Sequence, residues 1–331
     1  MRAIRLHSFG GPDRLVLDEL PDLTPGPGQV RIAVEVAGVH LVDTVLRRGD
    51  PGPVSLPLPE LPTVPGREVA GVVDALGDGV DPDWLGRRAV AHLGPVPGGY
   101  AEQAVTAADG QLFAVPGHMG AADAVAAVGT GRTALAVLEL EPPSPDDVVL
   151  VPSAAGGMGW LLVQAALERG ATVVAAARGG HRTARLAGLG ADLVVDYGEA
   201  GWDARVRDAV GGVTLVYDGV GGAVGRCGLE LLRPGGRLVL FGYSAGTPTR
   251  FDTDDVVRLG ITAGWTLGPR MAALPGGVPG LARRALDRVA SGAWRPLVTA
   301  YPLAEAARAH ADLEQRRALG KVVLTTGGGR R

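Results

Sequence analysis

The stretch Val148-Val-Leu-Val-Pro-Ser-Ala-Ala-Gly-Gly-Met-Gly159 indicates how the whole chain is built. Its first four residues are apolar and predict a buried parallel strand, because a strand covered on both faces has no polar alternation. A turn of small residues follows, and residues 160–169 predict a helix that ends at Gly170. Strand, turn and helix N-terminus in this order aim backbone N–H groups at a pyrophosphate. The stretch therefore predicts a dinucleotide-binding turn.

The glycine spacing within the turn supports this interpretation. Ala154-x-Gly156-x-x-Gly159 is a GxGxxG fingerprint with alanine in the first position. Alone it is a weak signal, since structural glycine turns are expected in a chain with 52 glycines. Here it follows a buried strand and opens a helix, which favours cofactor binding. Gly156 would let the backbone approach a phosphate, and Gly159 would let the helix pack against the strand.

Strand and helix patterns alternate from about Ala121 onward. Such alternation predicts an α/β fold with a Rossmann-type, doubly wound parallel sheet. The expected strands are 148–151, 172–177, 193–196, 215–218, 237–242 and 261–267, and the helices expected between them are 161–169, 182–189, 204–210 and 222–232.

Residues 1–118 predict a different, β-rich domain, because many short strands in one block favour a compact, barrel-like structure. The expected strands are 3–6, 15–19, 29–39, 69–76, 88–92 and 100–105, with a short helix at 42–48 and an irregular loop at 50–65 that carries six prolines. The chain ends with a helix, strand, helix and strand expected at 281–291, 297–301, 303–315 and 321–325. The closing strand pattern is similar to the first block. The predicted organisation is therefore 1–118, then 119–292, then a return to the first domain over 293–331.

Composition excludes several classes of function. The net charge of −3 gives no basis for binding nucleic acid or an anionic membrane. Cys227 is the single cysteine, which excludes an intrachain disulfide and a cysteine-cluster zinc site and is typical of a reducing cytoplasm. Residues 1–10 contain no signal-peptide run, and apolar segments are interrupted well short of about 20 residues, so no membrane-spanning helix is expected.

The sequence after the second expected strand indicates which dinucleotide binds. An NAD site places an acid about 20 residues beyond the glycine turn, and an NADP site places arginine there. Here Arg178 follows Ala177, and no acid occurs before Asp192. Arg182 lies one helical turn further, where it would join Arg178 around a 2′-phosphate. Both arginines also fit a plain solvated helix start, but the missing acid favours NADPH.

An ordered set of short motifs gives the chain a family resemblance. It resembles the zinc-independent quinone oxidoreductases of the medium-chain dehydrogenase/reductase superfamily, in the zeta-crystallin-like branch. Each motif is unspecific alone, but the set keeps the family's order over nearly the whole length. The motifs are Gly38-Val39-His40-x-x-Asp43, Pro65-Gly66-Arg67-Glu68, Gly98-Gly99-Tyr100-Ala101-Glu102, Gly131-x-Thr133-Ala134, the glycine turn, Leu189-Gly190-Ala191-Asp192, Asp196-Tyr197, Tyr217-Asp218-x-Val220-Gly221-Gly222, Phe241-Gly242 and Gly320-Lys321-Val322-Val323-Leu324.

The resemblance implies a GroES-like catalytic domain and a Rossmann domain that enclose NADPH. By position, Thr133 is expected near the nicotinamide, and Arg182 and Tyr197 near the 2′-phosphate. Arg178 would replace a serine that many relatives carry where this chain has Gly179. The pyrophosphate is expected along Ala154, Ala155, Gly156, Gly157, Met158 and Gly159, and the nicotinamide end along Phe241, Gly242 and Ser244. The resemblance also implies a homodimer that pairs residues 261–267 across a two-fold axis.

Zinc alcohol dehydrogenases share this superfamily, but the residues here argue against a metal. Their catalytic zinc needs an early cysteine and the histidine of a Gly-His-Glu motif. This chain has Arg67 in the histidine's place, and His40 with Glu68 supplies too few ligands. We therefore expect no metal.

A metal-free enzyme must align the nicotinamide with an acceptor that takes hydride directly. Quinones and α,β-unsaturated carbonyls fit, because charge develops on an oxygen that a donor can hold. His40, Asp43 and Arg47 are the candidate catalytic residues, although a His–Asp pair that only braces the loop fits equally well.

Three functions stay open from the sequence. Relatives often carry tyrosines where this chain has Val45 and Pro51, and a nearby tyrosine is the acid in related enoyl reductases. Quinone reduction tolerates that loss better, because water can protonate hydroquinone oxygens. NADPH-dependent quinone reduction is thus favoured over reduction of an activated C=C bond and over a non-catalytic NADPH-binding role.

Overall fold

The computed structural model describes residues 1–50, 57–94 and 98–327. It contains two compact units, Met1–Thr130 with Ala282–Arg331, and Gly131–Leu281. These limits differ from the expected 118/119 and 292/293 because two helices pack on the first unit's sheet: Ala124 of one and Leu286 of the other share a buried cluster with Val90. The bounds 1–118, 119–292 and 293–331 stay a prediction for the domains.

The second unit is built on a six-stranded parallel sheet. Its strand order is β10-β9-β8-β11-β12-β13, which is the doubly wound order 3-2-1-4-5-6. The strands are β8 (Val148–Val151), β9 (Thr172–Ala177), β10 (Leu193–Asp196), β11 (Val213–Asp218), β12 (Leu232–Leu240) and β13 (Thr262–Trp265). The buried runs of valine, leucine and alanine in β8 and β9 explain this arrangement, since helices cover both faces of a parallel sheet. The expected Rossmann-type α/β fold is confirmed.

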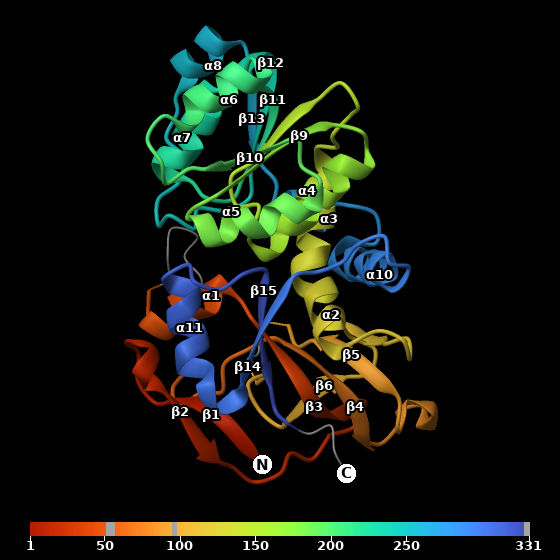
Figure 1. The fold of residues 1–331 in the computed structure, drawn as a ribbon. Helices are drawn as coiled ribbons and strands as arrows, with labels where there is room; N and C mark the ends of the chain where they lie inside the picture. The colour runs from red at the N-terminus through yellow and green to blue at the C-terminus, as the bar shows by residue number, and fades with distance from the viewer. Residues whose placement is uncertain (51–56, 95–97, 328–331) are drawn as a thin grey trace. The chain divides into compact units, whose positions relative to one another are not determined.

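Helices connect these strands and cover the sheet. They are α3 (Arg132–Leu140), α4 (Gly157–Glu168), α5 (Gly180–Leu186), η4 (Ala187–Leu189), α6 (Trp202–Val210), α7 (Gly222–Glu230), α8 (Thr253–Leu259) and α9 (Pro269–Ala272). Figure 1 shows α6, α7 and α8 grouped beside one another, and Trp202, Val206 and Leu229 from α6 and α7 pack into one buried cluster with Val216. Helix α4 packs on β8 and β9.

The first unit contains a seven-stranded sheet and a separate two-stranded sheet. The strand order is β14-β15-β3-β4-β5-β7, with β6 also paired to β3. The strands are β1 (Arg2–Leu6), β2 (Leu15–Glu19), β3 (Gln29–Val39), β4 (Glu68–Leu76), β5 (Arg88–His92), β6 (Gln103–Ala107), β7 (Leu112–Ala114), β14 (Val298–Pro302) and β15 (Lys321–Thr325). Because β15 pairs antiparallel with β3, β14 and β15 complete the sheet that β3 begins.

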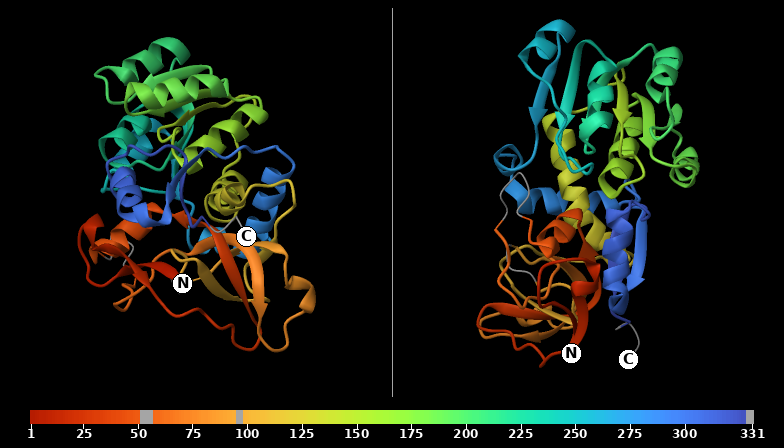
Figure 2. Two further views of the ribbon diagram at one scale, coloured as in Figure 1. Left: turned by 60° about the horizontal axis from the view of Figure 1, so that its bottom comes forward. Right: turned by 90° about the vertical axis from the view of Figure 1, so that its left-hand side faces the viewer.

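The helices of this unit pack on the sheet and on its edges, as Figure 2 shows from two further directions. They are η1 (Pro12–Arg14), α1 (Leu41–Arg48), η2 (Pro82–Trp84), α2 (Ala121–Ala126), the π-helical turn η3 (Ala127–Gly131), η5 (Leu303–Glu305) and α11 (Ala306–Glu314), and α10 (Gly277–Ala290) runs from the second unit into the first.

Several elements differ from the sequence prediction. Helix α4 begins at Gly157, before the expected start at residue 161, because Gly156 already caps it in an extended conformation. Strand β6 begins at Gln103 because Ala101 forms an isolated bridge with Ala3. The sequence did not predict β7, α2, α3, α8 or α9. Of the proline-rich loop 50–65, residues 51–56 lie outside the described part, and Thr63 forms a single bridge with Leu6.

The longest missed segment is helical and largely apolar. Ala121–Leu140 is a continuous helical stretch of 20 residues, long and apolar enough to cross a membrane. Within the most apolar window of this stretch, 78% lies buried inside the protein, which is typical of a core helix. Few polar residues mark its period, and Gly129 and Gly131 conceal the helix further.

Candidate active site

The glycine turn after β8 has the geometry that a dinucleotide requires. Gly156 is the extended N-cap of α4 and makes no side-chain cap bond. A Cβ at Gly159 would lie 2.0 Å from the carbonyl oxygen of Ser153, so only glycine lets the helix start this close to the strand. Ala154 and Ala155 are buried, whereas Gly156, Gly157 and Met158 are half-buried. The residues present therefore fit a pyrophosphate at the N-terminus of α4.

The expected 2′-phosphate residues come together at the ends of β9 and β10. Ala177 pairs with Asp196, so Arg178 and Tyr197 follow neighbouring strand ends. Arg178 is exposed and its stem lies over Gly198, and Arg182 is half-buried in the first turn of α5. Tyr197 packs in the buried core.

Gly179 shows why this chain lacks the family's serine. Its φ is +91°, a conformation that costs a side chain strain, and its N–H donates to Asp196 Oδ2 at 2.8 Å. Asp196 also accepts from the N–H of Gly198 at 2.7 Å. Asp196 thus holds the loop backbone through both of its carboxylate oxygens.

A buried aspartate organises the loop after β11. Asp218 is fully buried and its Oδ1 accepts from the N–H groups of Val220 and Gly221 at 2.8 and 2.9 Å. Its Oδ2 accepts from the hydroxyl of Thr249, which needs glycine at 225 because a Cβ there would lie 1.8 Å from Thr249 Oγ1. In the sequence, Asp218 is recognisable only as part of a motif. Its position between a buried strand and a Gly-Val-Gly-Gly turn is the feature that could have indicated its structural role.

The expected nicotinamide-end residues lie against this loop. A Cβ at Gly219 would lie 2.3 Å from the ring of Phe241, and Gly242 packs on Gly219. The N–H of Ser244 donates to the carbonyl of Gly219 at 3.1 Å. These residues lie at the carboxyl ends of β11 and β12, the edge where open α/β sheets bind ligands. Thr133 is half-buried in the first turn of α3, which packs beside α4.

A second polar site lies in the first unit, where three strands meet. Val39 at the end of β3 pairs with Val322 of β15, and Ala37 pairs with Val69 of β4. This register brings Lys321 and Glu68, the first residues of their strands, to the end of β3. His40 follows β3 directly and caps α1.

These three side chains form one cluster, which we name the His40–Glu68–Lys321 cluster. Lys321 Nζ donates to Glu68 Oε2 at 2.9 Å and lies 2.8 Å from His40 Nε2. His40 Nε2 lies 2.6 Å from Glu68 Oε1, but without hydrogen-bond alignment, so Oε1 keeps no hydrogen-bond partner. Lys321 and Glu68 are buried, and His40 leaves 30% of its side chain exposed.

The cluster is built around the charge of Glu68. Burial would raise the pKa of this carboxyl, but His40 and Lys321 outweigh it and hold the pKa well below its usual range. Two glycines make the space: a Cβ at Gly129 would lie 1.8 Å from Oε1, and one at Gly38 would lie 2.5 Å from Oε2. Gly129 belongs to the π-helical turn η3, a feature frequent at functional sites.

Asp43 belongs to a second network. Its Oδ2 accepts from the N–H of His40 at 2.8 Å and from the Tyr100 hydroxyl at 3.0 Å. Tyr100 also lies 3.1 Å from His310 Nε2, and His310 is fully buried with no partner at Nδ1. Burial lowers the pKa of His310 to about 4, and burial with the Asp43 charge raises that of Tyr100 well above its usual range. His310 is therefore neutral at pH 7.

Arg47 is buried and ion-paired. Its Nη2 donates to Glu314 Oε1 at 2.5 Å, and Arg48 shares the same oxygen. Within the described part of the chain, Nε and Nη1 of Arg47 have no hydrogen-bond partner. Burial lowers the pKa of its guanidinium, which the Glu314 charge opposes. The three sequence candidates are thus brought close to one another, but only His40 is substantially exposed.

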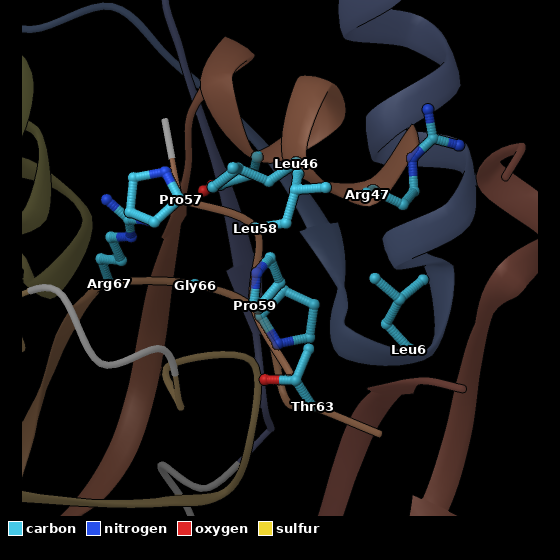
Figure 3. Close-up of a pocket in the computed structure, with 11 residues that line it drawn as sticks. Leu6, Leu46, Arg47, Pro57, Leu58, Pro59, Thr63, Gly66 and Arg67 are labelled. Atoms are coloured by element: carbon cyan, nitrogen blue, oxygen red, sulfur yellow. The ribbon is translucent and has the colours of Figure 1, made fainter. Parts of the chain in front are cut away.

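A pocket of about 360 Å³ opens beside these residues, entirely within the first unit (Figure 3). Its lining comes from β1, α1 and the segment before β4, and comprises Leu6, Asp43, Leu46, Arg47, Pro57, Leu58, Pro59, Thr63, Pro65, Gly66 and Arg67. In the described residues, no group of three or more His, Cys, Asp or Glu could hold a metal ion.

Sequence patterns indicate His40, Asp43 and Arg47 but assign no role to Glu68, Tyr100, His310 or Lys321. One signal was available for Lys321, the only lysine of the chain. A lone lysine in an arginine-rich chain suggests a place where a compact ammonium is needed. The meeting of residues 253 positions apart gave no local signal.

Known proteins match both parts of the chain. Residues 26–136 match the model described as alcohol dehydrogenase GroES-like domain, and residues 189–324 match the one described as zinc-binding dehydrogenase. A 2-haloacrylate reductase of Burkholderia sp is 34% identical, with 96% of this chain and 97% of the relative covered. A quinone oxidoreductase of Sus scrofa is 31% identical, with 98% and 97% covered.

A solved structure extends the similarity to the fold. The Escherichia coli quinone oxidoreductase complexed with NADPH gives a TM-score of 0.86 at 27% identity, covering 98% of this chain and all (100%) of that one.

Proposed function

Since the chain belongs to the zinc-independent quinone oxidoreductases of the medium-chain dehydrogenase/reductase superfamily, we propose that it is an NADPH-dependent quinone oxidoreductase. It passes reducing equivalents to a quinone-type acceptor without a metal. The observation that carries this function is the match, over nearly the whole chain, to a quinone oxidoreductase solved with NADPH. The turn around Gly156 and the arginines at the end of β9 fit that cofactor.

We assign the cofactor contacts as the sequence predicts them. The N-terminus of α4 binds the pyrophosphate, and Arg178, Arg182 and Tyr197 surround the 2′-phosphate. Thr133, Phe241, Gly242 and Ser244 border the nicotinamide. Bound NADPH supplies a hydride, which is two electrons, and the acceptor takes up a proton.

His40 is our candidate for the donor that holds the acceptor oxygen. It is the one member of its cluster with an exposed side chain, and Lys321 with Glu68 fixes its Nε2 edge. A ring fixed in this way loses little entropy when an acceptor binds against its exposed part. Asp43 and Arg47 are positioning residues in this proposal: Asp43 holds the backbone of His40, and Arg47 links α1 to α11.

A reductase of activated C=C bonds is the second candidate function. The observation that favours it is the 34% identity to a 2-haloacrylate reductase, over 96% of this chain. Both functions use the same donor and differ in the atom that accepts hydride.

We further propose a cytoplasmic homodimer of the zeta-crystallin-like branch. The sheet of the second unit ends at β13, where Trp265 leaves 38% of its surface exposed, and such an edge can pair with a second copy. The unpaired Cys227 agrees with a reducing compartment.

The test is turnover of the purified protein with NADPH and NADH against benzoquinones, naphthoquinones, enals and enones. The proposal expects NADPH oxidation with quinones as the preferred acceptors. Preferred turnover of enals or enones would move the function to the second candidate, and tight NADPH binding without turnover of any acceptor would contradict both.

A further inference from the structure

The pocket beside α1 combines apolar walls with an excess of positive charge. Leucines and prolines supply most of its lining (Figure 3). The charged residues of the lining are Asp43, Arg47 and Arg67. Asp43 already accepts from Tyr100 and from the backbone of His40. Glu314 is shared by Arg47 and Arg48, so one carboxylate faces two guanidinium groups. The pocket therefore favours an anion with a small apolar body.

Arg67 is the cation of the pocket whose side chain has no partner among the residues that the structure describes. Among the described residues, no carboxylate lies within ion-pair distance of its guanidinium, and its backbone carbonyl makes the one bond it takes part in, to the N–H of Leu93. In Figure 3 the Arg67 side chain extends beside Pro57, on the opposite side from Arg47. An unpaired, half-buried guanidinium at a pocket wall is well suited to bind a carboxylate through two parallel hydrogen bonds.

The backbone that carries Arg67 is fixed. Gly66 has a φ of +89°, and a Cβ there would lie 2.2 Å from the ring of the buried Tyr100. The carbonyl of Gly66 accepts from the N–H groups of Gly98 and Gly99 at 3.1 and 3.0 Å. Arg67 also directly precedes Glu68, the buried centre of the His40–Glu68–Lys321 cluster. A ligand that binds Arg67 thus meets a side chain whose backbone position is already fixed before binding.

We propose that this pocket binds a small α,β-unsaturated carboxylate and that Arg67 is the residue that binds its carboxylate. The inference rests on the second candidate function, reduction of an activated C=C bond, and names an acceptor class for it. Reduction adds a hydride from NADPH to the β-carbon and a proton to the α-carbon, so the C=C bond becomes a C–C single bond and NADPH becomes NADP⁺. The guanidinium assists because it offsets the second negative charge that develops towards the carboxylate.

The size of the pocket agrees with this class. About 360 Å³ is at the lower end of the range for small-molecule sites, roughly 300–1,000 Å³. The walls of Leu46 and Pro59 offer apolar contact to a substituent on the double bond. If Arg67 were removed, a carboxylate in the pocket would lose its only unpaired cationic partner among the side chains that line it.

The test compares an acid with its neutral ester on the full chain. Calorimetric binding of 2-chloropropionate, which cannot be reduced, is measured beside methyl 2-chloropropionate on wild type, Arg67→Met and Arg67→Lys. The acid should bind wild type, lose about tenfold to a hundredfold in affinity in Arg67→Met, and recover part of it in Arg67→Lys. Arg87→Met is the matched control, because Arg87 is exposed and pairs with Asp83. Thermal unfolding checks that each variant folds.

Kinetics with NADPH give the second readout. The ratio of kcat/KM for 2-chloroacrylate to that for its methyl ester should fall at least about tenfold in Arg67→Met and stay at the wild-type value in Arg87→Met. Equal affinity of the acid for wild type and Arg67→Met, or an unchanged ratio, would overturn the carboxylate site. Turnover of 1,4-benzoquinone by wild type tests the quinone oxidoreductase function separately from the carboxylate site. Absence of this turnover would contradict the quinone oxidoreductase function, whereas acid binding that depends on Arg67 would still support the carboxylate site.

Discussion

The glycine turn at β8 and the His40–Glu68–Lys321 cluster are two sites built by different means. The first is made of backbone: its donors are N–H groups, and its residues are consecutive in the chain. The second is made of side chains that come from the ends of β3, β4 and β15. A backbone site fails when an atom is added to it, and a side-chain site fails when a charge loses its partner. Four predictions test this difference, in order of decreasing effect.

Adding a side chain to the turn should have the largest effect. Gly159→Val places carbon atoms where the carbonyl of Ser153 lies, since even a Cβ would be 2.0 Å away. We expect an insoluble protein, or a folded one whose affinity for NADPH falls more than about a hundredfold. Fluorescence titration with NADPH and thermal unfolding measure this. Gly188→Ala, where a Cβ meets nothing within 4 Å, should behave as wild type. An equal loss of NADPH affinity in Gly188→Ala would show that the effect is not specific to the turn.

Removing one charge from the cluster should have the next largest effect. Lys321→Met leaves the Glu68 carboxylate buried with His40 alone, and breaking a buried pair costs about 3–5 kcal/mol of unfolding free energy. Adding Glu68→Gln to that variant should restore a large part of the stability, because the unpaired charge is then gone. Urea unfolding measures both. Glu305→Gln, in an exposed pair with Arg308, should cost at most about 1 kcal/mol. Additive losses from the two cluster substitutions would show that the charges are not coupled.

Acid should destabilise the first unit through His310. Burial lowers its pKa from the ordinary value of 6.5 to about 4, so the unfolded chain binds the extra proton between these pH values. The stability that the neutral imidazole contributes is complete above pH 6.5 and is lost as the pH falls towards 4. Between pH 7 and pH 5 this amounts to about 2 kcal/mol. Measured by urea unfolding, His310→Gln should lack this part of the pH dependence, and exposed His118→Gln should keep it.

The smallest effect concerns the cofactor's adenosine end. Arg182→Ala should weaken NADPH binding about tenfold and NADH binding far less, because one charge-assisted contact to the 2′-phosphate is lost. Arg185→Ala on the same helix is the control, since Arg185 lies over the ring of Trp160. Dissociation constants from fluorescence decide the matter, and equal losses for the two cofactors would be evidence against the 2′-phosphate assignment.

Each region could be predicted from the sequence to the extent that its structure depends on residues close together in the chain. Strands β9 and β10 were placed to the residue because continuous apolar runs of this length, bounded by glycine and acids, allow few alternatives. The start of α4 was placed too late because Gly156 and Gly157 resemble a loop, although they begin the helix. Ala121–Leu140 was missed because a largely buried helix has few polar residues to reveal its period.

The candidate site divides in the same way. The cofactor turn and the missing acid after Ala177 are local features, and the sequence displays them directly. His40 and Asp43 were found because they lie three positions apart in one motif. Glu68, Tyr100, His310 and Lys321 could not be assigned, because their neighbours are far away in the chain and their burial is a property of the folded unit.

The sequence by itself predicted the alternating strands and helices, the turn that is typical of a dinucleotide site, and NADPH as the cofactor. Each of these depends on neighbouring residues, because backbone conformation and helix starts are set within a few positions. Only the tertiary structure decided that Lys321 meets Glu68 beside His40, because the pairing of β15 with β3 and of β3 with β4 sets that contact. The same pairing explains why two charges can be buried together: the register supplies each with its partner as the sheet forms.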